Sequence, residues 1–493
     1  MLPISYFASI CHFTTLALAS IAISACSAPP SDLGTSSTGA SSSSGEAGMG
    51  GTSGSSSGST GMGGFGGTAA GGSGGNGPGT GGMGTGGAGM GGTGGGTCIG
   101  EPTCVCPEHG PIAGYSEHDG LREIDPAHFD LVDTGTWNAY AAAVDALGLP
   151  YVALDALNLN RTATKPDTAL AANLATVVGY QAAFEWEAGD QNVTYWVPQG
   201  LTGGKAGNRD YVLVSWHYDE TNIAADPNPP ASGDKGIRLS LADVTTIGGN
   251  VPYRHALFVE PKGAAGFVSV DIHAGGMALY GSYLYVADTS RGVRVFDMTR
   301  IMSVSTSAIC SAQIGKVGAE TCAYGYAYAI PQVGGFYYPT GTDSTCRAKF
   351  SYLSLDTTSN PPSLISGEYD NDVNVGIYSR LLRFPLDATT HKLLVDAKNV
   401  VHANGAWYAG NRNVQGATAI NGKFFLNATR YNGSLFTGLQ NQASKVYLSA
   451  DGKWGYMPEG IHYIPENGRL FINTEGHTNM PRIVYAVKAS SVP

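Results

Sequence analysis

The sequence predicts an all-β fold, a β-propeller of about five blades, that follows a long N-terminal segment with no core of its own. Three observations support this prediction. Short runs rich in Val, Ile, Tyr, Phe and Thr alternate with turn residues through most of the chain, a short motif recurs at blade-length spacing, and the composition changes abruptly near residue 107.

The N-terminal segment consists of a signal region and a tether. Many of the 71 Gly residues of the chain lie in its first hundred positions, where Gly, Ser, Thr and Met alternate without an apolar period. Such a composition cannot offset the entropy lost on ordering, so we expect disorder. The expected organisation is a lipoprotein-type signal peptide at residues 1–26, a Gly/Ser-rich disordered tether at 27–97, a Cys-containing cap region at 98–179 and the propeller at 180–493.

The signal region indicates export. Residues 7–25 are apolar and end in Ile23-Ser24-Ala25-Cys26, which resembles a bacterial lipobox. The resemblance implies cleavage before Cys26 and acylation of its sulfur, which would give an outer-membrane or cell-surface lipoprotein. The first basic residue is Arg122, a departure from the usual positive n-region. Simple secretion and an uncleaved anchor therefore stay open as alternatives.

Export affects how the cysteines are interpreted. Outside the cytosol an even number of cysteines favours disulfides, and the pairing stays open among Cys98, Cys104, Cys106, Cys310, Cys322 and Cys346. Charged residues make up only 13% of the chain and the net charge is −11. No basic face is expected to neutralise phosphates, so nucleic acid is excluded as a partner.

The first elements after the tether are two helices. Residues 137–147 (WNAYAAAVDAL) and 168–178 (TALAANLATVV) carry helical patterns, and each is followed by a Gly. The segments that follow have the composition and spacing of strands in an all-β fold. The clearest strands are expected at residues 211–218, 237–241, 255–260, 283–287, 293–297, 423–427 and 482–487.

Internal repetition favours a propeller over a sandwich. Four segments share a polar residue, a Gly, an apolar residue, a turn and a strand; they are residues 197–202, 272–278, 414–419 and 457–463. A fifth unit with a degenerate start is expected between Cys346 and His402. Residues 180–187 are expected to supply a closing strand beside residues 482–487, which gives about five blades, with six as the alternative.

The clearest unit, HAGGMALYGSYLYVADTSRGVRVFDM at residues 273–298, resembles an NHL or YVTN-type propeller repeat, and residues 458–476 have the same shape. From Tyr180 to the end, the chain also resembles secreted propeller proteins of soil bacteria. This likeness implies a fold and carries no assigned chemistry.

The candidate site lies where the repeats begin. Inner strands line the axis of a propeller, so the polar residues before the repeat Gly are expected to face it: Gln199, Gln415 and Glu459, with His273 nearby. Glu459 should lose solvation there, which raises its pKa and makes it a candidate acid. Asp271 lies two residues before His273 and could orient its imidazole as a base. The alternative is that all five serve the fold.

Two aromatic positions and one acidic loop complete the candidates. Tyr324, Tyr326 and Tyr328 alternate with small residues, which places three rings on one strand face as a saccharide platform or as blade packing. Trp407 could serve a pocket rim in the same way. Asp370, Asp372 and Asn374 offer oxygen ligands for calcium, although the Gly and Glu of an EF-hand are missing, and no other cofactor is expected.

These features define three functional hypotheses. The first is a monomeric, surface-tethered propeller that binds a small polar ligand, a saccharide, at its central channel through Gln199, Gln415, Tyr326 and Trp407. The second is an extracellular hydrolase or lyase acting on glycosides or lactones, with Glu459, His273 and Asp271 as catalytic residues. The third is a protein-interaction scaffold. Its membrane contact in each case is the lipid anchor.

Overall fold

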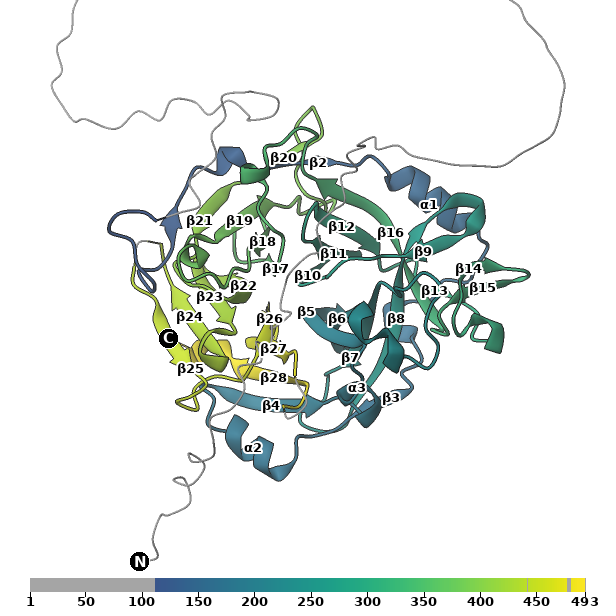
Figure 1. Ribbon diagram of the computed structural model, residues 1–493, viewed down its shortest axis with the longest axis horizontal. Coiled ribbons are helices and arrows are strands. Elements are labelled where there is room, and N and C mark those ends of the chain that lie inside the picture. Colours follow the sequence, from purple (N-terminus) through teal and green to yellow (C-terminus); the bar gives the residue numbers. More distant parts are fainter. Residues whose placement is uncertain (1–110, 441, 477–479, 493) are drawn as a thin grey trace, which may run out of the picture. The chain divides into compact units, whose positions relative to one another are not determined.

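The fold is a five-bladed β-propeller. A computed structural model describes residues 111–440, 442–476 and 480–492, and within them five blades are arranged around a common axis (Figure 1). The predicted fold class is confirmed, with five blades rather than six. The tether, the signal region, Cys26, Cys98, Cys104 and Cys106 lie outside the described residues.

Each blade has four main strands, and their order along the chain runs outward from the axis in the first four blades. The first blade comprises β5 (Trp196–Ala206), β6 (Arg209–Tyr218), β7 (Ile237–Asp243) and β8 (Val251–Pro261). The second comprises β10 (Met277–Tyr280), β11 (Tyr283–Asp288), β12 (Gly292–Asp297) and β16 (Tyr328–Tyr337). The third comprises β17 (Tyr352–Asp356), β18 (Ser363–Gly367), β19 (Arg380–Pro385) and β21 (Gly405–Tyr408). The fourth comprises β22 (Val414–Ile420), β23 (Lys423–Ala428), β24 (Ser434–Gly438) and β25 (Lys445–Leu448).

The fifth blade joins the two ends of the propeller. It consists of β26 (Pro458–Ile464), β27 (Arg469–Thr474), β28 (Ile483–Lys488) and β4 (Tyr180–Glu185). The predicted closing strand is confirmed, because β4 pairs antiparallel with β28, with Ala183 opposite Tyr485. A single blade therefore ties the start of the propeller to its end.

The repeat glycines let the inner strands approach one another. The five inner strands β5, β10, β17, β22 and β26 contact each other in a closed cycle. A Cβ on Gly276 would lie 1.8 Å from the backbone nitrogen of Leu353, and a Cβ on Gly460 would lie 2.5 Å from that of Leu201. No side chain fits at these positions. The repeated Gly of the sequence thus marks close backbone contact between blades.

Side-chain hydrogen bonds also link successive blades near the axis. Ser215 Oγ donates to Ala274 O at 2.7 Å, from the first blade to the second. Asn427 Nδ2 donates to Glu459 O at 2.9 Å, and Asn473 Nδ2 donates to Gln199 O at 2.8 Å. The donors lie in β27 or at the equivalent position of β6 and β23, so three blades fix the backbone of the next inner strand in the same way.

The segment before the first blade lies along the outer edges of the propeller (blue in Figure 1). It contains α1 (Trp137–Asp145), α2 (Thr168–Leu174) and α3 (Ala188–Gln191), and the strands β1 (Arg122–Glu123), β2 (Asp130–Asp133) and β3 (Arg161–Ala163). The two predicted helices are confirmed. The three strands pair with β21, with β16 and β20 (Val400–His402), and with β8. Residues 111–179 therefore extend the sheets at their rims instead of forming a layer of their own.

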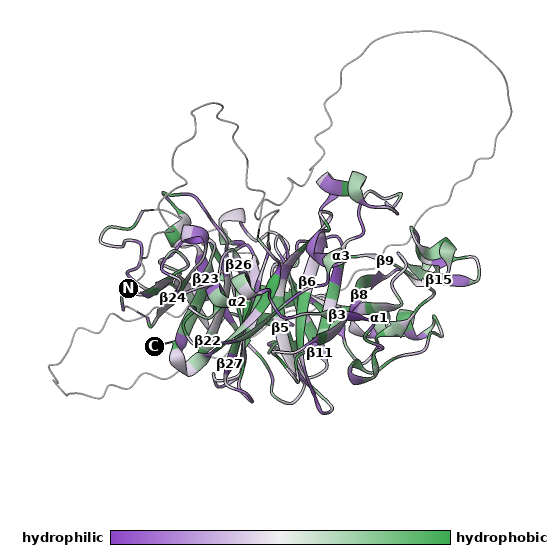
Figure 2. Cartoon of the chain, turned by 90° about the horizontal axis from the view of Figure 1, so that it is seen from below, coloured by the Kyte–Doolittle hydropathy of each residue, from purple (hydrophilic) through white to green (hydrophobic). Residues whose placement is uncertain are grey.

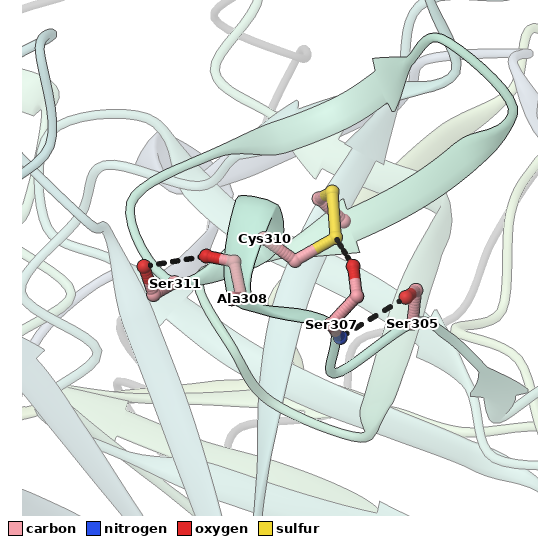
Figure 3. The surroundings of a disulfide bond; sticks show 6 residues. Ser305, Ser307, Ala308, Cys310 and Ser311 are labelled. Atoms are coloured by element: carbon pink, nitrogen blue, oxygen red, sulfur yellow. Dashed lines mark hydrogen bonds between the residues drawn. A yellow bond between two sulfur atoms is a disulfide. The ribbon is translucent and has the colours of Figure 1, made fainter.

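The first two blades are joined at their outer edge. Residues Ala329–Pro331 of β16 pair parallel with β8, while the rest of β16 completes the second blade. Four short strands lie near this junction: β9 (Phe267–Ser269), β13 (Met302–Ser303), and the hairpin of β14 (Ile314–Val317) with β15 (Glu320–Ala323). A disulfide joins Cys310 to Cys322 in β15 (Figure 3). Cys346 is disulfide-bonded as well.

The core is apolar along every blade, and the strands carry most of the hydrophobic residues (Figure 2). The largest cluster centres on the buried rings of Trp186, Trp216 and Tyr253. The ring centroids of Trp216 and Tyr253 lie 5.6 and 4.9 Å from that of Trp186, and both rings meet it edge to face. In the part of the chain that the structure covers, no helix is both long and apolar enough to cross a bilayer.

Candidate functional site: an acid–base cluster at the propeller axis

The starts of the inner strands and the ends of the second strands lie together at one end of the propeller axis. Each inner strand is antiparallel to the second strand of its blade, so the start of one lies beside the end of the other. Val197 pairs with His217 in the first blade, and Pro458 pairs with Thr474 in the fifth. We call the polar residues at this end the axial cluster: Gln199, His217, His273, Gln415, Glu459 and Glu475.

Glu459 and Gln415 form a buried pair between the fourth and fifth blades. Gln415 Nε2 donates to Glu459 Oε1 at 3.1 Å, and the two side chains belong to residues that are 2% and 3% exposed. Burial raises the pKa of Glu459 well above its ordinary value, and the nearby Glu475 adds to the rise. The predicted direction of this pKa is confirmed. Burial among the inner strands therefore favours the protonated form of the Glu459 carboxyl.

Glu475 is the more accessible acid, and the sequence analysis missed it. It directly follows β27 and is half-buried. Burial raises its pKa to about 7, although the guanidinium of Arg482 opposes the rise. In the structure, Glu475 is equivalent to His217, since Thr474 faces Pro458 as Trp216 faces Pro198, but this strand register is not visible in the sequence.

His217 and His273 form a stacked pair. Their rings are 4.6 Å apart between centroids and inclined by 25°. Burial and, to a smaller extent, the neighbouring His217 lower the pKa of His273 to about 3. Burial also lowers the pKa of His217. Both imidazoles are thus neutral at neutral pH.

The structure gives Asp271 a different partner from the predicted one. Asp271 is exposed and hydrogen-bonds to Asp234, whose pKa rises to about 7 through burial and this carboxyl–carboxyl contact. Asp234 Oδ1 also accepts a hydrogen bond from Gly236 N at 2.5 Å. The prediction that Asp271 orients His273 is therefore wrong, because the segment between them is not a strand and His273 packs on His217 instead.

The predicted aromatic stripe is wrong. Tyr324 lies in a turn with a φ of 50°, and Gly325 follows with a φ of 80°, so the chain reverses before β16 begins at Tyr328. Tyr324 and Tyr326 line a cavity beside the first blade, and Tyr328 packs in another cluster. The alternation of rings in the sequence crosses a turn and does not mark one strand face.

Trp407 also lies away from the axial cluster. It is 6% exposed in β21, and its ring packs 5.2 Å from the ring of Phe424 in the neighbouring blade. The guanidinium of Arg383 lies 5.4 Å from the Trp407 ring. A role at a pocket rim does not fit this burial, and the residue stabilises the contact between the third and fourth blades.

The acidic loop uses its carboxylates within the loop. Asp370 Oδ1 accepts from Asp372 N at 2.8 Å, and Asp372 Oδ1 accepts from Asn374 N at 2.7 Å. These are turn contacts that short acidic side chains commonly make. Within residues 111–492, apart from the undescribed positions, no group of three or more His, Cys, Asp or Glu is placed to hold a metal ion.

The fold and the axial cluster define the class: a five-bladed propeller with two carboxyls of raised pKa and two imidazoles of lowered pKa at one end of its axis. No family model matches the sequence, and no curated protein matches it.

Among solved structures, the chain is similar to a GH43_1 enzyme from Xanthomonas citri, also solved with xylotriose and with xylose. The identity is 10%, the match covers 65% of this chain and 93% of that chain, and the TM-score is 0.30. A glycoside hydrolase family 43 arabinoxylan arabinofuranohydrolase from Bacillus subtilis, in complex with cellotetraose, matches with 11% identity over 60% of this chain and 64% of that chain, at a TM-score of 0.31. These likenesses concern the fold. The likeness to NHL and YVTN-type repeats stays a prediction.

Proposed function

We propose that this propeller hydrolyses glycosidic bonds of a neutral saccharide at the axial cluster, with Glu475 as the proton donor. The observation that carries the proposal is the state of Glu475: it is half-buried, and its pKa of about 7 keeps a proton available at neutral pH. A general acid is most effective when its pKa lies near the working pH.

The remaining residues of the cluster suit a neutral ligand. The amide of Gln415 carries no charge, the imidazoles of His217 and His273 have lowered pKa values, and burial favours the protonated form of Glu459. Such groups exchange hydrogen bonds with hydroxyls without the cost of burying an unpaired charge. A polyhydroxyl ligand matches this combination.

In the proposed reaction, Glu475 protonates the glycosidic oxygen as its bond to the anomeric carbon breaks. A water oxygen forms the new bond to that carbon, and the proton lost by the water passes to the neutral imidazole of His217. Glu475 and His217 share Asp219 and Arg482 as charged neighbours, which supports their placement in one site. Regain of the proton by Glu475 completes the cycle.

Binding without turnover is the second candidate. It is supported by Asp271: the carboxyl of Asp271 hydrogen-bonds to Asp234 and so is not free to assist a base. We place either activity outside the cell, on a tether anchored through Cys26, because of the lipobox-like sequence. A Cys26→Ala chain should then leave the membrane fraction.

The test is a screen of aryl glycosides with the parent and with Glu475→Gln. We expect parental turnover that falls above about pH 7, and a loss of about 100-fold or more in kcat for the variant, with substrate binding retained. Glu466→Gln, which changes an exposed carboxyl on the same blade, is the matched control. Saccharide binding with no turnover in the parent would replace the hydrolase by the binding candidate.

A further inference from the structure

A second site lies beside the first blade, where none of the axial residues reaches. An open cavity of about 370 Å³ is lined by residues at the starts of β5 and β7, in β8, in α3 and in the turn between β15 and β16. This volume is in the range of small-ligand pockets. All residues of its wall belong to the described part of the chain.

The wall is cationic in a chain whose net charge is −11. Four basic side chains line the cavity, against two carboxylates; they are Arg161, Lys235, Arg238 and Arg254, against Asp190 and Asp226. An excess of positive charge in a concave, partly enclosed site attracts anions.

Asp190 has its acceptor capacity filled by the protein. It accepts from Arg238 at 3.0 Å, from Tyr253 at 2.5 Å, from His255 at 3.0 Å and from Arg161 at 3.2 Å. Burial alone would raise the pKa of Asp190, but His255 and Arg238 hold it below its ordinary value. The Asp190 carboxylate is therefore hydrogen-bonded within the wall and has little acceptor capacity left for a ligand.

Asp226 is engaged in the same way. Lys235 Nζ lies 2.5 Å from Asp226 Oδ2, and Tyr218 donates its hydroxyl to the same oxygen at 3.0 Å. Three tyrosine rings surround the Lys235 ammonium with centroids about 6 Å away, those of Tyr195, Tyr218 and Tyr324. The ammonium is thereby held in place at the cavity wall.

The hydrogen-bonding capacity that remains at the cavity wall consists of N–H donors on cationic side chains. A guanidinium carries five N–H groups and an ammonium three. Among the described residues, Arg254 uses its guanidinium for one hydrogen bond, to Asn158 O at 2.8 Å, while it stacks over Tyr328. Arg238 is clamped between the rings of Trp196 and Trp216, at 4.8 and 4.6 Å. A ligand that completes this wall must supply acceptors and negative charge.

Aromatic rings supply the rest of the lining. Tyr195, Trp196, Tyr324 and Tyr326 all face the cavity. Such rings pack against the C–H faces of a sugar ring while their polar ends bond to hydroxyls. From the charge, the spare donors, the size and these rings, we infer that the cavity binds a monosaccharide-sized sugar acid, a uronate, through its carboxylate. This inference does not depend on hydrolysis at the axis.

The disulfide holds one wall of this cavity. Cys310 precedes the lining residue Ser311, and Cys322 lies two residues before Tyr324 (Figure 3). Tyr324 N donates to Gln313 O at 2.8 Å, which fastens the turn to the same hairpin. A wall fixed before binding lowers the ordering cost of the ligand complex.

The test is calorimetric titration of the whole chain at pH 7 with D-galacturonate and D-glucuronate. The comparison ligands are D-galactose, D-glucose, acetate and phosphate. We expect uronate binding at least tenfold tighter than that of the neutral sugars or the simple anions. Arg254→Gln and Tyr326→Ala should each weaken uronate binding about tenfold or more, while Arg209→Gln, an exposed arginine on β6 that does not line the cavity, should not.

Each alternative outcome has a meaning. Equal binding of uronate and neutral sugar, or of uronate and phosphate, overturns the assignment of a sugar acid. Uronate binding that survives Arg254→Gln and Tyr326→Ala but is lost in Glu475→Gln moves the ligand to the axis and overturns the cavity. If a variant unfolds, Arg254→Lys replaces it, since this change keeps the charge but removes the fork and should still weaken binding.

Discussion

Glu475→Gln should make the protein more stable at alkaline pH. In the unfolded chain this carboxyl loses its proton near pH 4.5, whereas in the native state it keeps the proton until about pH 7. Its contribution to stability is therefore present in acid and is lost as the pH rises through 7. The rise in pKa corresponds to about 3 kcal/mol, reduced to about 2 kcal/mol for partial solvent screening. Gln cannot ionise, so the variant should not lose this stability as the pH rises.

The assay is denaturant unfolding of parent and variant at pH 4 and pH 8. At pH 4 the two unfolding free energies should agree within about 1 kcal/mol, and at pH 8 the variant should be more stable by about 2 kcal/mol. Glu466→Gln should show no such pH-dependent difference, because that side chain is exposed. If Glu475→Gln and the parent lose stability in parallel between pH 4 and pH 8, Glu475 ionises normally and is not the proton donor.

Three further predictions address the rest of the fold and site. The native state keeps His273 neutral while the unfolded chain protonates it near pH 6.5, so the free energy of unfolding should fall from pH 6.5 toward pH 3. His273→Asn should recover about 2 kcal/mol at pH 4. A His273 imidazole NMR signal that titrates near pH 6.5 would contradict this. Gly276→Ala should destabilise by at least about 3 kcal/mol or prevent folding, since its Cβ would lie 1.8 Å from Leu353 N, whereas Gly249→Ala, with its nearest atom at 3.7 Å, should melt like the parent. Replacing Cys310 and Cys322 together by Ser should lower stability by up to about 3 kcal/mol and weaken uronate binding several-fold by calorimetry; Ser307→Ala, which removes only a 3.7 Å contact to Cys310 Sγ, should do neither.

The clearest strands followed from local sequence. Residues 283–287 and 293–297 became β11 and β12 because alternating apolar residues and turn residues specify a hairpin without distant help. The repeat Gly positions predicted blades because backbone contact at the axis admits no side chain. The parallel pairing of β16 with β8 left no such signal, and neither did the two-residue strand β1, since their partners are distant in the chain.

The site was predictable only where position alone determines chemistry. Glu459 precedes a repeat Gly, so its burial and raised pKa followed from the repeat. Glu475 follows a strand that looked ordinary, and its raised pKa depends on tertiary burial next to Arg482. The tyrosine alternation failed because Gly325 turns the chain within it. Sequence periodicity cannot detect a reversal inside its own window.

The pairing of β4 with β28 also governs how the ring can form and open. Nearly the whole propeller separates the two strands along the chain, so this contact closes a longer loop than any other pair of named strands and should form late during folding. A chain that ends before Ile483 leaves β4 at an open edge and the cycle of inner strands unsupported on both sides. Once closed, the ring can start to unfold at this seam only by breaking a full strand pair at once, which favours slow unfolding of the kind that protects a protein against proteases.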